Sequence, residues 1–143
     1  MTSLAFIAVV DDPKRFASAR ELSSYLGLVP SERNSGDKKK APGAITKTGS
    51  SLLRSYLVAA TYHLTSERAP DSNLKRWHSQ LAKRSSKKKA AVALARRLAR
   101  ILWAMWRDGK PFNDDKTVVV PDAAPPAPFK RQARSSAPAA PPA

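Results

Sequence analysis

Glycine and proline divide this chain into stretches that can form helices and stretches that cannot. Asp12-Pro13 places a capping acid before a proline at a first helical position, and Gly27 supplies a stop after Leu26. Residues 28–48 hold four more glycines and prolines and show no apolar periodicity. The sequence therefore predicts a helix over residues 12–26, with Phe16, Ala19, Leu22 and Leu26 at helical spacing, followed by a long loop.

Two more helices are predicted between this loop and residue 85. Ser50 or Ser51 caps the first, which ends before Pro70 because a residue preceding proline avoids the helical region. Its expected apolar face consists of Leu53, Leu57, Ala60 and Leu64. Asp71 or Ser72 caps the second, a short helix that carries Leu74, Trp77 and Leu81.

The longest predicted helix runs from about Ser86 to Asp108 and stops at Gly109. Its expected apolar side carries Ala91, Leu94, Ala95, Leu98, Leu102 and Met105, and its basic side carries Lys89, Arg96, Arg100 and Arg107. The predicted class is an all-α fold of four or five helices, with a long basic loop between the second and third. We predict a helical domain over 1–112 and a disordered tail over 113–143, because that proline- and alanine-rich segment buries too little apolar surface to order itself.

The charge of the chain selects a class of partner. Its 143 residues include 26 Lys and Arg against 11 Asp and Glu, which gives a formal net charge of +15. Such a field attracts polyanions, because each neutralised phosphate releases counterions. A membrane partner is not expected, since no apolar run approaches the roughly 20 residues that span a bilayer. The absence of cysteine excludes disulfides and zinc fingers and fits a cytoplasmic protein, which we expect to associate with the nucleoid.

The predicted loop concentrates candidate phosphate ligands around a serine. Ser35-Gly36 lies among cations, and a serine in that setting could attack a phosphate. The candidate DNA-binding residues in and beyond the loop are Arg33, Lys38, Lys39, Lys40, Lys47, Arg54, Arg96 and Arg100. Each has a plainer interpretation: Ser-Gly is a common loop pair, and lysine triads, including a second at Lys87–Lys89, are often merely solvated. The three tryptophans are best explained as packing residues rather than base-stacking ones.

Several kinds of catalytic site are not predicted. The acids are scattered, so no pair suggests a two-metal carboxylate site, and we assign no metal ligand and no cofactor to this chain. His63 and His78 lie on different predicted helices without an acid at ligand spacing, and we expect ordinary helix residues. There is no phosphate loop of the Walker type and no dinucleotide fingerprint.

An ordered set of short motifs carries a family resemblance. These are Asp12-Pro-Lys-Arg-Phe16, Tyr25-Leu-Gly-Leu-Val-Pro30, Asn34-Ser-Gly36, Gly43-Ala-Ile-Thr-Lys-Thr-Gly49, Leu52-Leu-Arg54, Ala91-Val-Ala-Leu-Ala-Arg-Arg-Leu-Ala-Arg-Ile-Leu102, Trp106-Arg-Asp-Gly109 and Pro111-Phe112. In order and spacing they resemble the C-terminal domain of the DEDD transposases of bacterial insertion sequences, the group that includes IS110, IS116 and IS902. The resemblance covers about residues 3–112.

The resemblance implies a specific chemistry. Family members combine an RNase H-like domain, whose Asp-Glu-Asp-Asp site holds Mg²⁺, with a helical domain whose serine attacks a DNA phosphate and becomes covalently joined to DNA. That serine corresponds to Ser35, and Ser50 and Ser51 are then cap residues. A structured bridge RNA selects the DNA sites, and the complete proteins are expected to be homo-oligomers.

One departure from the family is large, because this chain lacks the DEDD metal domain. We therefore expect a fragment or remnant of a transposase that needs a DEDD domain from the same or another protomer for strand transfer. Two alternatives remain open at this stage: a non-catalytic, basic nucleic-acid-binding protein, and a scaffold whose tail recruits partners.

Overall fold

A computed structural model describes residues 1–31 and 44–114. Within these ranges the chain forms five α-helices and one short 3-10 helix, and no strand. The elements are α1 (Thr2–Val10), η1 (Pro13–Arg15), α2 (Ala19–Tyr25), α3 (Ser51–Thr65), α4 (Asn73–Arg84) and α5 (Lys87–Asp108). The predicted all-α class is confirmed. Most of the predicted tail and the centre of the predicted basic loop lie outside the described residues.

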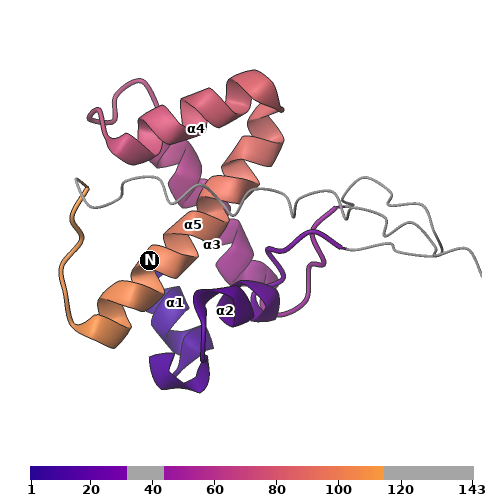
Figure 1. Ribbon diagram of the computed structural model, residues 1–143, viewed down its shortest axis with the longest axis vertical. Coiled ribbons are helices and arrows are strands. Elements are labelled where there is room, and N and C mark those ends of the chain that lie inside the picture. Colours follow the sequence, from indigo (N-terminus) through magenta and orange to yellow (C-terminus); the bar gives the residue numbers. More distant parts are fainter. Residues whose placement is uncertain (32–43, 115–143) are drawn as a thin grey trace, which may run out of the picture.

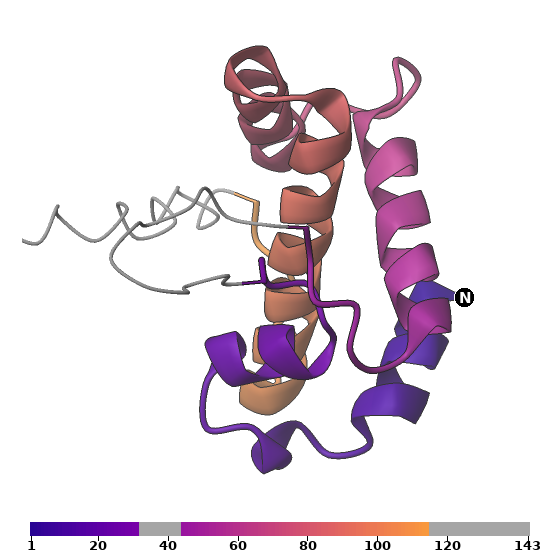
Figure 2. The ribbon, with the colours of Figure 1, turned by 90° about the vertical axis from the view of Figure 1, so that its right-hand side faces the viewer.

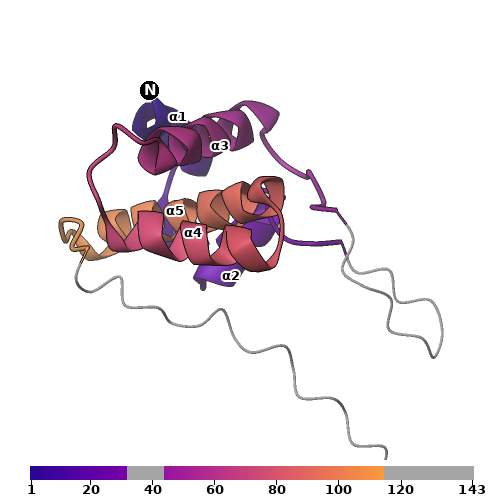
Figure 3. The ribbon, with the colours of Figure 1, turned by 90° about the horizontal axis from the view of Figure 1, so that it is seen from above.

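Helix α5 is the centre of the structure (Figure 1). It packs against α2, α3 and α4, and α1 packs against α3. Seen from above, α5 lies between α2 on one side and the pair α1 and α3 on the other, with α4 alongside it (Figure 3). Helix α1 reaches α5 through Phe6, whose ring lies edge-on to that of Trp106 with the centroids 6.5 Å apart. Helix α5 is therefore the common packing partner of the other helices.

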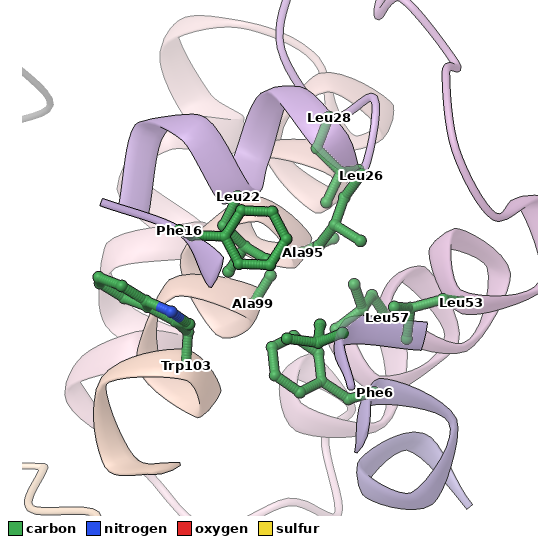
Figure 4. Packing of buried hydrophobic residues seen from close by; sticks show 11 residues of the cluster. Phe6, Phe16, Leu22, Leu26, Leu28, Leu53, Leu57, Ala95, Ala99 and Trp103 are labelled. Carbon is green, nitrogen blue, oxygen red and sulfur yellow. The ribbon is translucent and has the colours of Figure 1, made fainter. Parts of the chain in front are cut away.

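The apolar core lies where α1, α2, α3 and α5 meet (Figure 4). Its phenylalanine, leucine and valine side chains come from α1, α2, α3 and the segments next to α2, whereas α5 contributes two alanines and a tryptophan. The members are Phe6, Val10, Phe16, Leu22, Leu26, Leu28, Leu53, Leu57, Ala95, Ala99 and Trp103. Because the two alanines are small, Leu22 of α2 and Leu26 just after it can lie close to the backbone of α5. The indole of Trp103 donates a hydrogen bond of 2.8 Å to the carbonyl of Pro13, which ties η1 to α5.

Serine begins four of the five helices. In each case the hydroxyl accepts a hydrogen bond from the backbone N–H three residues later, which satisfies one of the unpaired donors of the first turn. The capping serines are Ser18, Ser50, Ser72 and Ser86, at 3.2 to 3.3 Å from their donors. Of the alternatives that the sequence left open, Ser50 rather than Ser51 caps α3, and Ser72 rather than Asp71 caps α4.

The single helix predicted over residues 12–26 is wrong, because it is two elements. Asp12 caps η1 by accepting from Lys14 N at 2.8 Å, but the backbone becomes extended at Phe16. A new helix then begins at a variant of the capping box, in which Ser18 Oγ accepts from Glu21 N and the Glu21 carboxylate accepts from the N–H of Ala17, one residue before the cap. The pattern Ser-x-x-Glu at 18–21 was the sequence signal for this break.

The buried faces of α3 and α5 are rotated from their predicted positions. On α3 the buried residues are Leu53, Leu57 and Thr61, where the hydroxyl of Thr61 donates to the carbonyl of Val58 at 2.7 Å. On α5 the buried residues are Ala90, Ala91, Leu94, Ala95, Ala99 and Trp103, whereas Leu98, Leu102 and Met105 are only half-buried. Four of the six buried residues of α5 are alanines, and the prediction omitted two of them, Ala90 and Ala99.

Candidate nucleic-acid interface

Two short arms of the chain run together between α2 and α3 (Figure 2). We call residues 26–31 and 44–49 the neck. Three backbone hydrogen bonds join the arms: Ser31 N to Ala44 O at 2.8 Å, Thr46 N to Val29 O at 3.0 Å and Lys47 N to Gly27 O at 3.1 Å. Pro30 and Ile45 form an antiparallel bridge within this ladder. The neck therefore holds residues 31 and 44 side by side, at the two ends of the segment that contains Ser35.

The neck is also fixed to α2. Leu28 N donates to the carbonyl of Ser23 at 3.0 Å, and the hydroxyl of Thr48 donates to the carbonyl of Ser24 at 3.1 Å. Both arms are thus bonded to the last turn of a helix that packs on α5. The position of the neck relative to the core is set by backbone contacts as well as by side chains.

Two glycines permit this close approach. Gly27 and Gly49 have positive φ angles of 68° and 73°, which side chains rarely adopt. A Cβ atom on Gly27 would lie 2.3 Å from the carbonyl oxygen of Thr48, and one on Gly49 would lie 2.3 Å from the carbonyl oxygen of Tyr25. Both positions therefore require glycine for conformation and for space.

Arg54, a predicted DNA ligand, makes contacts inside the neck. It projects from the first turn of α3, and its Nη1 donates to three carbonyl oxygens: Leu26 at 3.2 Å, Thr48 at 2.5 Å and Gly49 at 3.1 Å. One carbonyl belongs to the first arm and two belong to the second. The guanidinium therefore joins both arms to α3.

Of the other candidate site residues, three lie within the described ranges and five lie outside them. Lys47 is exposed on the neck with a φ of 57°, and its N–H is held by the ladder. Arg96 is half-buried and Arg100 exposed, one turn apart on α5. The predicted nucleophile Ser35 and the predicted ligands Arg33, Lys38, Lys39 and Lys40 lie outside the described residues.

A further basic region, which the candidate set omitted, lies where α4 meets α5. We call residues 83–89 the α4–α5 turn. Five of its seven residues are cations, and all seven are exposed. The five are Lys83, Arg84, Lys87, Lys88 and Lys89. Only the last three were noted from the sequence, and the signal for the whole turn was the absence of any acid between Asp71 and Asp108.

Two other properties of the described residues bear on function. No three His, Cys, Asp or Glu side chains among residues 1–31 and 44–114 gather closely enough to hold a metal ion. In the same ranges no helix is both long enough and apolar enough to cross a membrane.

Comparison with known proteins gives consistent matches. Residues 1–79 match the model of the family described as Transposase IS116/IS110/IS902. The Sinorhizobium fredii protein y4pF/y4sB, which is named as a putative transposase, is 37% identical over 104 residues, which cover 71% of this chain and 27% of that protein. The transposase for insertion sequence element IS1111A of Coxiella burnetii is 35% identical over 106 residues, 73% of this chain and 29% of the relative.

A third similar protein is named for DNA inversion. The pilin gene-inverting protein of Moraxella lacunata is 31% identical over 109 residues, 75% of this chain and 33% of that protein. The chain thus spans about a quarter to a third of the length of these curated relatives.

Proposed function

We propose, because this chain belongs to the IS116/IS110/IS902 family of transposases, that it supplies the serine-bearing, DNA-binding part of a DNA transposition or recombination reaction. The observation that carries the proposal is the neck, which lies within the matched residues 1–79 and brings together the two ends of the segment that contains Ser35. Gly27, Gly49 and Arg54 fix that arrangement on the helical body.

The proposed reaction assigns Ser35 as the nucleophile. Its Oγ forms a bond to a DNA phosphorus while the bond from that phosphorus to a strand oxygen breaks. The hydroxyl proton passes to a base outside this chain, and the released strand oxygen takes up a proton. Arg33, Lys38, Lys39 and Lys40 neighbour Ser35 in the sequence and would stabilise the charge that develops on the phosphate.

The remaining machinery is proposed to come from a DEDD domain of the same or another protomer. A serine hydroxyl is a weak nucleophile until a base or metal removes its proton. A Mg²⁺ ion on the DEDD domain would supply that activation, and a bridge RNA would select the DNA sites. Lys47 and Arg100, both exposed, are proposed to contact DNA phosphates from this chain.

The test is a covalent adduct assay. The chain is combined with a DEDD domain of a relative, the matching RNA and a labelled DNA site, and protein–DNA adducts are separated under denaturing conditions. We expect an adduct whose linkage mass spectrometry assigns to Ser35, and we expect none from Ser35→Ala. The control is Ser51→Ala, because Ser51 is exposed at the start of α3 and Ser50, not Ser51, caps that helix.

Two outcomes would contradict the proposal, and a third would invalidate the control. An adduct that persists in Ser35→Ala would move the nucleophile elsewhere, and loss of the adduct in Ser51→Ala would show that the assay reports general damage. Salt-dependent DNA binding with no adduct in any variant would instead identify the chain as a non-catalytic nucleic-acid-binding protein.

A further inference from the structure

The α4–α5 hairpin has an unusually one-sided charge. From Ser72 to Arg107 the sequence holds eleven lysines and arginines and no aspartate or glutamate. Like charges repel one another, so a protein gains no stability from crowding them together. Their concentration on two adjacent helices therefore suits an anionic partner.

Several of these cations already have partners within the fold. Lys75 donates to the carbonyls of Ser66 and Ala69, and Arg76 pairs with Asp71 at 3.0 Å. Arg97 lies over the ring of Trp77, 4.9 Å from its centroid. These contacts tie Lys75 and Arg76 to the segment before α4, and Arg97 to α4.

The five cations of the α4–α5 turn differ from the others. Their side chains are exposed, and none makes an ion pair with another residue in the described part of the chain. They lie at the end of the molecule opposite α1 and α2 (Figures 1 and 2). The turn is therefore a basic end that is accessible to a large partner.

The composition of the turn favours one class of polyanion. Its two remaining residues are Ser85 and Ser86, so it offers no aromatic ring on which the bases of a single strand could stack. It also offers no apolar side chain to insert into a membrane. A surface that offers positive charge but neither stacking nor apolar insertion is suited to the phosphate backbone of a duplex. That backbone carries one negative charge per about 1.7 Å of helix axis.

We propose that the α4–α5 turn is a phosphate-binding surface for duplex DNA, in addition to the neck. The proposal rests on the proposed function only in taking DNA as the partner. The proposed contacts to the DNA phosphates come from the side chains of five residues, and they position the duplex without reading its base sequence. These residues are Lys83, Arg84, Lys87, Lys88 and Lys89.

The experiment compares two variants of the full chain that each lose four positive charges. In the turn variant Lys83, Arg84, Lys87 and Lys88 are replaced by glutamine, and Ser86 is kept because it caps α5. In the control variant the exposed cations Lys14, Arg20, Arg68 and Lys110 are replaced by glutamine. Affinity for a duplex of arbitrary sequence is measured over a range of salt concentrations, with helical content checked by circular dichroism.

We expect the slope of log K against log salt concentration to become shallower by about 2 to 4 units in the turn variant, because each phosphate that is no longer neutralised reduces the slope by about 0.9. The control variant should change by less than about 1 unit, because it alters only the overall field. Equal changes in the two variants would mean that the protein responds to total charge, and the proposal would be refuted.

Other results separate the remaining explanations. If the wild-type chain binds duplex DNA and the turn variant shows the same salt slope, the α4–α5 turn is not a phosphate-binding surface. That result would leave the proposed function intact. A weakening confined to a structured RNA hairpin or to single-stranded DNA would overturn the choice of duplex DNA. A wild-type chain that binds no duplex DNA at all would contradict both proposals.

Discussion

Replacing Arg54 by methionine tests whether the guanidinium serves the fold or the DNA. Its Nη1 carries two hydrogens, so at most two of the three carbonyl contacts are full hydrogen bonds at one time. Hydrogen bonds from a charged group contribute about 1.5–3 kcal/mol each when buried. Because Arg54 is half-buried, water replaces part of each bond, and about 1 kcal/mol per bond is a reasonable value. Arg54→Met should therefore cost about 2 kcal/mol, or about 10 °C in Tm for a domain of this size.

The assays for Arg54→Met are denaturant unfolding, amide hydrogen exchange and DNA binding. We expect faster exchange at the N–H groups of Ser31, Thr46 and Lys47, which form the ladder of the neck. Arg100→Met is the control, because Arg100 is exposed on α5, and it should cost less than about 0.5 kcal/mol. Equal stability of the two variants would refute the structural role. A DNA salt slope shallower by about 1 unit in Arg54→Met would show instead that Arg54 contacts phosphate.

Three further predictions concern backbone conformation, burial and protonation. Gly27→Ala places a Cβ 2.3 Å from a backbone carbonyl oxygen, and it should lower the free energy of unfolding by more than about 3 kcal/mol, measured with denaturant. At Gly109 an added Cβ meets nothing within 4 Å, so Gly109→Ala should cost only about 1 kcal/mol for the positive φ. Leu57→Ala, at a fully buried position, should cost about 2–5 kcal/mol, and the half-buried Leu98→Ala clearly less; equal costs would contradict the assigned buried face of α5. Partial burial lowers the pKa of His78 in the folded state, so the unfolded chain takes up a proton first; the free energy of unfolding should fall as pH drops below about 6.5, and His78→Gln should remove that part of its pH dependence.

The sequence predicted well what depends on local chemistry. The start of α5 after Ser86 and its end at Gly109 follow from capping serine and left-handed glycine, and both are confirmed. The all-α class and the family follow from periodic apolar residues and ordered motifs. These features need only neighbours within a few residues, and a single sequence displays them directly.

Three features were not predicted, one because it depends on contacts between distant residues and two because a competing local pattern concealed them. The role of Arg54 within the neck depends on carbonyls of Leu26 and Thr48, which a sequence does not place next to it. Thr61 is buried although it is polar, and its hydroxyl donates to a carbonyl of its own helix, so polarity was a misleading guide to burial. The break near Phe16 was visible in principle, but the apolar spacing across it concealed the capping box.

The contact of Asp114 with the start of α4 shows a similar long-range dependence. The carboxylate of Asp114 accepts from Asn73 N, and its carbonyl accepts from the side-chain amide of Asn73, both at 2.9 Å. The predicted boundary at residue 112 would leave this contact outside the helical domain. A recombinant fragment should therefore extend past residue 114 if α4 is to keep both bonds.

The neck also gives the protein a form of modularity. Residues 31 and 44 are joined by their own hydrogen bond, so the helical body is complete on either side of that contact. In proteins generally, each doubling of the length of a flexible loop costs only about 0.6 kcal/mol in closure entropy. Proteins built on this body could therefore vary the segment between residues 31 and 44 without having to evolve a new core.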